Sequence, residues 1–227
     1  MIVRGPWEPD SEGRMFKNRH HAGQVLARQL TRYEQRNDVL VLALPRGGVP
    51  VGFELARALG VALDVFVVRK LGVPEQQELA MGAIASGGQI VLNEDVVTHL
   101  HIDQATIDAV AQVEMRELSR REKAYRGDRP PLNVAGKTLI LVDDGLATGA
   151  TMRAAAQALK QLGPARLIVA VPVGAPEVCR RLAHEVDEVV CAATPEPFRA
   201  VGQWYADFTQ TTDEEVHGLL AQAQGAT

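Results

Sequence analysis

The chain has 227 residues, of which 46% are hydrophobic and 23% charged, and its formal net charge is −4 at pH 7. This size and composition fit one α/β domain with a core of its own. The negative charge gives no electrostatic reason to expect a nucleic acid or an anionic membrane surface as partner, so an anionic ligand must be bound by local groups. There is no apolar run of membrane-spanning length and no signal-peptide core, so we expect a cytoplasmic protein.

Two cysteines, Cys179 and Cys191, lack any CxxC or Cys/His spacing. We therefore expect two buried thiols rather than a disulfide or a metal site. His20 and His21 have no third ligand nearby in the sequence, so surface or capping roles are expected for them.

The first half of the chain opens with a dozen residues rich in glycine, proline and charge, which are expected to form a loose lead-in. Apolar residues at helical spacing then predict a helix over 20–33, and the run VLVLAL predicts a buried strand over 39–44. A helix over 49–59 and a strand over 63–68 follow. This alternation of wholly apolar strands with helices predicts a parallel sheet.

The middle of the chain departs from that alternation. Two short apolar segments, 81–85 and 89–92, predict a hairpin because Ser86, Gly87 and Gly88 lie between them. A long helix is expected over 103–125, followed by a proline-containing linker over 127–136. The charged positions 116–123 of this helix mix both signs and are expected to form a solvated face.

The second half returns to strands and helices. We expect strands over 138–142, 166–171 and 188–192, helices over 151–162 and 177–184, and a last helix capped near Thr212. The fold class is therefore α/β, an open, twisted, mainly parallel sheet flanked by helices, with an inserted hairpin and long helix and a small hood. We expect one domain over 1–227, with its core at about 39–192, the insertion at about 71–136 and a tail over 193–227.

The segment LILVDDGLATGAT, residues 139–151, contains the most informative chemistry. Asp143 and Asp144 follow a buried strand, at the sheet edge where open α/β folds bind ligands. Thr148 and Gly149 then open a helix, whose amides and dipole suit a phosphate. Two carboxylates beside a phosphate site indicate a ligand that also presents hydroxyls or a metal, such as a sugar phosphate. A response-regulator Asp pair or a plain Thr-Gly helix cap would explain only part of this arrangement.

This segment resembles the signature with which type I phosphoribosyltransferases bind 5-phosphoribosyl 1-diphosphate (PRPP). The resemblance implies that Asp143 and Asp144 bind the ribose hydroxyls. It also implies a 5′-phosphate loop at Gly145, Ala147, Thr148, Gly149 and Thr151. Gly145 stands where the family usually has an aliphatic residue.

A second loop, LPRGGVPVG at residues 44–52, lies between a buried strand and a helix. In the same family the corresponding loop binds the diphosphate, often with a cis peptide, which implies this role for Arg46, Gly47 and Gly48; a plain strand–helix turn is the alternative. The family also places a basic residue after the next strand, which implies diphosphate contacts from Arg69 and Lys70. A solvated basic pair is the alternative there.

The resemblance weakens after Lys70. The segment 71–79, where the family's flexible catalytic loop begins, lacks the patterns of purine or orotate enzymes. Trp204 and Tyr205 are candidates for stacking on a base, with packing of the tail as the alternative.

The resemblance implies an enzyme, a transferase that moves the phosphoribosyl group from PRPP to a nitrogenous base and releases diphosphate. Asp143, Asp144 and Lys70 are the catalytic candidates. Mg²⁺ would be held mainly by PRPP, with water-mediated contacts to the two aspartates. The other options are a PRPP- or nucleotide-binding regulatory protein and a hydrolase or phosphorylase acting on a ribose phosphate, and a homodimer stays open. The sequence contains no GxxxxGK[ST] or GxSxG motif of an NTPase or α/β-hydrolase.

Overall fold

A computed structural model describes residues 2–3 and 15–225 of the chain. Its centre is a six-stranded sheet in the order β1-β9-β8-β7-β2-β3, and every neighbouring pair is parallel. The strands are β1 Ile2–Val3, β2 Val39–Ala43, β3 Ala62–Val65, β7 Thr138–Val142, β8 Arg166–Val173 and β9 Glu188–Ala193. The predicted α/β class with a parallel sheet is thus confirmed.

Helices cover both faces of this sheet, which explains why its inner strands are apolar after their first residues, Thr138, Arg166 and Glu188 being the polar ones. In β2, Val39 and Val41 belong to one buried cluster and Leu40 and Leu42 to the other. The first cluster includes residues of α1 Arg19–Ala27, α2 Gly48–Leu59 and α7 Asp213–Gly225, and the second includes residues of α5 Ala150–Gln161 and α6 Pro176–Leu182. The alternation of side chains along each strand therefore builds two separate cores.

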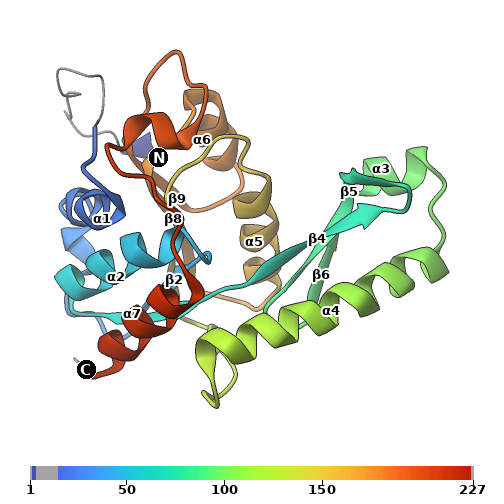
Figure 1. Ribbon diagram of the computed structural model, residues 1–227, viewed down its shortest axis with the longest axis horizontal. Helices are drawn as coiled ribbons and strands as arrows, with labels where there is room; N and C mark the ends of the chain where they lie inside the picture. The colour runs from blue at the N-terminus through green and yellow to red at the C-terminus, as the bar shows by residue number, and fades with distance from the viewer. Residues whose placement is uncertain (1, 4–14, 226–227) are drawn as a thin grey trace.

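Residues 68–126 form a projection that we call the arm (Figure 1). Its antiparallel sheet joins β4 Val68–Val73, β5 Gln76–Ala85 and β6 Gln89–Leu92, and its helices are α3 Glu94–His99 and α4 Gln104–Arg126. Helix α4 leads back toward the central sheet, where Arg126 forms two hydrogen bonds of 3.0 and 3.1 Å with Asp64. The predicted hairpin and long helix are confirmed.

The strand expected over 63–68 is wrong as a single element. β3 ends at Val65, and β4 begins at Val68 in the other sheet. The chain leaves the central sheet because Val67 bonds with Ser86 of the arm: its N–H donates to the Ser86 hydroxyl at 2.9 Å, and its carbonyl accepts from the Ser86 N–H at 2.8 Å. The insertion consequently begins three residues earlier than expected.

Differences also occur near the amino terminus. The helix expected over 20–33 is divided into α1 and a short 3₁₀ helix, η1 Thr31–Tyr33. Residues 2–3 of the expected lead-in pair with β9 instead, and residues 4–14 lie outside the described residues.

The two cysteines also depart from expectation. The structure joins Cys179 of α6 to Cys191 of β9 as a disulfide, so the expectation of separate thiols is wrong. Both residues are fully buried in the second core, where the side chains of a helix and its underlying strand face each other. Within the described residues, no helix is long and apolar enough to cross a membrane.

Candidate functional site

The two aspartates lie directly after β7, at the carboxyl edge of the central sheet. The Asp143 carboxylate accepts a hydrogen bond of 2.8 Å from the Asp144 N–H. Desolvation raises the pKa of both carboxyl groups; the neighbouring charge of Asp144 raises that of Asp143 further, while Arg19 acts in the opposite direction on both. Two carboxylates held together at this cost are suited to hydroxyl donors or a cation.

Arg19 is a site residue that sequence reasoning missed. It is the first residue of α1, and its Nε donates to Asp144 Oδ2 at 2.8 Å. Its Nη1 donates to the Thr209 carbonyl at 2.7 Å, and its guanidinium carbon lies 3.9 Å from the Phe208 ring centre. No motif marks Arg19, because the contact joins segments far apart in the chain.

The loop that contains Arg46 packs directly against the acidic pair, because β2 is the neighbour of β7 in the sheet. A Cβ atom on Gly47 would overlap the Asp144 carboxylate, and one on Gly48 would lie 2.7 Å from the Val142 carbonyl. The Pro45–Arg46 peptide is cis, as the family resemblance implies. The Gly48 N–H donates to the Leu44 carbonyl at 3.0 Å, so Gly48 contributes close packing rather than a bond to an anion.

The predicted phosphate loop leads into α5, which begins at Ala150. Gly149 has a φ of +75°, and a Cβ there would lie 2.5 Å from Val178 Cγ1, so both conformation and space require glycine. A Cβ on Gly145 would lie 2.5 Å from Val201 Cγ1. The tail therefore fills the space that the family's usual aliphatic residue would need. Thr148 is exposed, and its hydroxyl lies 3.4 Å from the Ala150 N–H.

The two basic residues of β4 lie on opposite faces of the arm sheet. Lys70 and Thr151 both line a cavity of about 450 Å³ between this sheet and α5, so the structure brings Lys70 to the phosphate loop. Arg69 instead faces α4, where its Nε donates to Glu114 at 2.8 Å. Since Arg69 is engaged in holding α4 to β4, its expected contact with the diphosphate does not fit this structure.

The aromatic residues of the tail pack on the protein. The Tyr205 ring lies between Phe16 and Phe208, with centroid distances of 5.3 and 5.0 Å, and its hydroxyl donates to the Asp144 carbonyl at 2.6 Å. Tyr205 is only 4% exposed, so the expectation that it stacks on a base does not fit the structure. Trp204, at the end of η2 Val201–Trp204, is half-buried against Phe198, and its stacking role stays a prediction.

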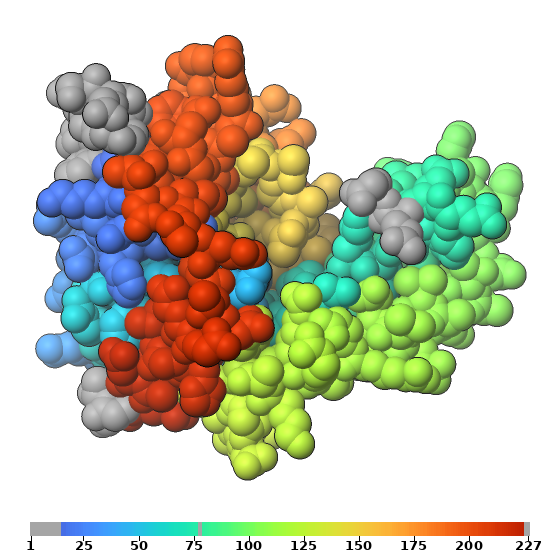
Figure 2. Space-filling model, in the orientation of Figure 1, coloured from blue at the N-terminus to red at the C-terminus, as the bar shows by residue number. Residues whose placement is uncertain are grey.

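The surface of the molecule has a hollow beside the arm. Figure 2 shows it between the orange and red tail and the green arm, with light-blue atoms of the β2–α2 region at its floor. Arg46, in the loop between β2 and α2, has its Nη1 3.8 Å from Oδ1 of Asp213 at the start of α7. The acidic pair and the phosphate loop follow β7, Arg46 follows β2 and Lys70 lies in β4, so the candidate site draws on three segments of the chain.

A family model described as "Phosphoribosyl transferase domain" matches residues 16–194. A Mycobacterium tuberculosis protein whose name assigns it provisionally to the phosphoribosyl transferases is 49% identical over 210 residues. That match covers 92% of this chain and 47% of the relative, so the chain spans about half the length of this relative.

The crystal structure of the protein TT1426 from Thermus thermophilus is similar in fold and sequence. It superposes with a TM-score of 0.81 at 43% identity, covering 91% of this chain and 98% of that chain. The bifunctional protein PyrR of Chloroflexus aurantiacus is 34% identical over 131 residues, which cover 56% of this chain and 65% of that protein.

Proposed function

This chain belongs to the phosphoribosyl transferase family, and from that membership we propose that it transfers the 5-phosphoribosyl group of PRPP to a nitrogenous base and releases diphosphate. The observation that carries the proposal is the packing of the Arg46 loop on the acidic pair, beside the helix start at Ala150. A phosphate, a ribose and a diphosphate would each find suitable groups there.

The proposed roles follow from chemistry and position. The amides at the start of α5 and the Thr148 hydroxyl bind the 5′-phosphate, because a helix amino terminus favours an anion. Asp143 and Asp144 accept hydrogen bonds from the ribose hydroxyls and orient the sugar. Arg46 and Lys70 stabilise negative charge on the departing diphosphate.

Magnesium is part of the proposal. The described residues contain no group of three or more His, Cys, Asp or Glu side chains that could hold a metal ion. The acidic pair nevertheless fits Mg²⁺, which prefers oxygen ligands and usually combines one or two carboxylates with waters and phosphate oxygens. When bound, Mg²⁺ would neutralise charge on the diphosphate, and Asp143 and Asp144 would contact it directly or through water.

The test is calorimetric titration of the full chain with PRPP, with and without Mg²⁺, followed by an assay of diphosphate release with a panel of bases. Magnesium-dependent binding with release in the presence of one base supports the transferase. Binding without release for any base would favour a PRPP-sensing protein, and release in water alone would favour a hydrolase.

A variant pair tests the site itself. Asp144→Asn should weaken PRPP binding, because an amide replaces one of the two ribose-binding carboxylates. Asp38→Asn is the matched control, since Asp38 precedes β2 at the opposite edge of the sheet and pairs with Arg36. Unchanged PRPP affinity in Asp144→Asn would refute the assignment.

A further inference from the structure

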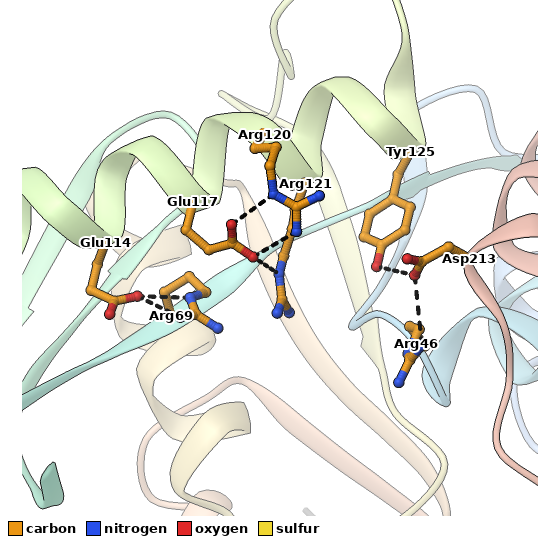
Figure 3. Close-up of polar contacts among 8 residues, drawn as sticks. All are labelled: Arg46, Arg69, Glu114, Glu117, Arg120, Arg121, Tyr125 and Asp213. Carbon is orange, nitrogen blue, oxygen red and sulfur yellow. Dashed lines mark hydrogen bonds and ion pairs between the residues drawn. The ribbon is translucent and has the colours of Figure 1, made fainter.

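Arginine side chains gather where the arm returns to the site. Figure 3 shows Arg69 on β4, Arg120 and Arg121 on α4, and Arg46 below the helix. Each of them contacts a carboxylate of Glu114, Glu117 or Asp213. The group therefore holds four guanidiniums that are partly neutralised by three carboxylates.

The neighbours Arg120 and Arg121 differ in how they use Glu117. Arg120 binds it with both Nε and Nη2, at 2.7 and 2.8 Å, and its side chain is 67% exposed. Arg121 binds Glu117 through Nε alone, at 2.7 Å, and its side chain is 40% exposed. Within the described part of the chain no hydrogen bond is recorded for its Nη atoms, so Arg121 is oriented by Glu117 while its two amino groups can bind an anion.

A short series of contacts connects Arg121 to Arg46. Tyr125 lies four residues after Arg121, on the same face of α4, where such neighbours have Cβ atoms about 5–6 Å apart. The Tyr125 hydroxyl donates to Asp213 Oδ1 at 2.8 Å, and the same oxygen lies 3.8 Å from Arg46 Nη1. Arg121 and Arg46 therefore flank one Tyr125–Asp213 pair (Figure 3).

The electrostatics of Tyr125 agree with this proximity. Desolvation and then the hydrogen bond to Asp213 raise the pKa of Tyr125 to about 12, while the charges of Arg121 and Arg46 act in the opposite direction. The charges of Asp213 and Tyr125 act on Arg120 as well, so what distinguishes Arg121 from Arg120 is its single Nε bond to Glu117.

We infer that Arg121 of the arm, together with Arg46 of the loop between β2 and α2, binds the diphosphate anion. The inference rests on the proposed function. Two guanidiniums on separate elements suit a diphosphate, because each can bind phosphate oxygens with two parallel N–H groups and the anion has two phosphates to engage. A monophosphate at the start of α5 would not need Arg121.

Binding of inorganic diphosphate, with Mg²⁺ present, to the full chain tests this inference by calorimetry. Arg121→Ala should weaken diphosphate and PRPP binding about 10- to 100-fold, the loss expected for hydrogen bonds to a charged partner. Arg120→Ala is the matched control, with the same charge change and the same carboxylate partner, and should change affinity by less than about threefold. Arg121→Lys should recover part of the loss by restoring charge without the two-pronged geometry.

Several outcomes would overturn the inference. Equal losses in Arg120→Ala and Arg121→Ala would show a general charge effect, and an unchanged affinity in Arg121→Ala would exclude contact. Thermal unfolding of each variant separates misfolding from lost contact, and a fully folded Arg121→Lys gives an independent measure if Arg121→Ala is unstable. If the unaltered chain binds PRPP, and Asp144→Asn weakens that binding while Arg121→Ala leaves it unchanged, only the inference about Arg121 fails. If the unaltered chain binds neither PRPP nor diphosphate, the proposed function fails as well.

Discussion

Replacing Tyr205 by phenylalanine isolates one hydrogen bond that fixes the backbone of the acidic pair. The ring would keep its contacts with Phe16 and Phe208, so the change leaves no cavity. What is lost is the 2.6 Å bond to the Asp144 carbonyl, at a residue that is only 4% exposed. Water cannot readily replace that donor, so the free energy of unfolding should fall by about 1–3 kcal/mol. For a chain of this size, Tm should then fall by about 2–12 °C.

Urea unfolding and calorimetric PRPP titration would measure both consequences of Tyr205→Phe. We expect PRPP affinity to fall as well, because the Asp144 backbone loses an anchor. Tyr33→Phe is the matched control: it removes a buried hydroxyl that donates to Glu188 Oε2 at 2.8 Å, at the start of β9. Both variants should lose stability, but only Tyr205→Phe should bind PRPP less tightly. A stability loss below about 0.5 kcal/mol for Tyr205→Phe would refute the reasoning, since surface substitutions cost that little.

Three further changes test other parts of the site. Gly47→Ala should reduce PRPP binding and stability, because the Cβ of the new alanine would overlap the Asp144 carboxylate. Gly218→Ala is the comparison: Gly218 lies in α7 with open space around it, so this change should raise the free energy of unfolding by about 0.5–1 kcal/mol. Thermal unfolding measures the stability of both variants. Burial and the Asp144 charge raise the folded-state pKa of Asp143, so the folded protein keeps this proton to a higher pH than the unfolded chain does. The free energy of unfolding should therefore fall as pH rises between the unfolded and folded pKa values. Urea unfolding from about pH 4 upward should show a shallower decline in Asp143→Asn, and an equal decline would contradict this account. Thr148→Val should weaken phosphate binding by about 1–3 kcal/mol in direct titration if the hydroxyl is a donor, and no change would leave the helix amides as the only donors.

The sequence was sufficient for the parts of the fold that depend on local pattern. The apolar runs at β2 and β7 predicted buried strands of a parallel sheet, whereas the pairing of β2 with β7 is a finding of the structure. The Thr-Gly turn before α5 was also predictable, because the direction of its amides and the backbone conformation of Gly149 depend only on neighbouring residues. The hairpin of β5 and β6 required only its turn residues.

The failures concern contacts between distant segments. Arg69 and Lys70 are adjacent in a strand and so must point to opposite faces, but the partners that those faces meet, α4 for Arg69 and the cavity beside α5 for Lys70, depend on the strand belonging to the arm sheet. Arg19 reaches Asp144 only because α1 packs beside the carboxyl edge. The role of Tyr205 depended on which partners its ring and hydroxyl would find in the tail, and no periodicity specifies that choice.

The bond between Arg126 and Asp64 has a consequence for how the chain folds. Asp64 is in β3, and the arm leaves the central sheet just after β3 and returns to it at the end of α4. The neighbouring strands β2 and β7 are separated by the whole arm in sequence, so their pairing closes a long loop and should be slow. An arm that folds first and clasps its own base shortens that loop, because its two ends are then already together. We therefore expect hydrogen-exchange labelling during refolding to detect protection in β5 and α4 before protection in β7, with the central sheet completed last.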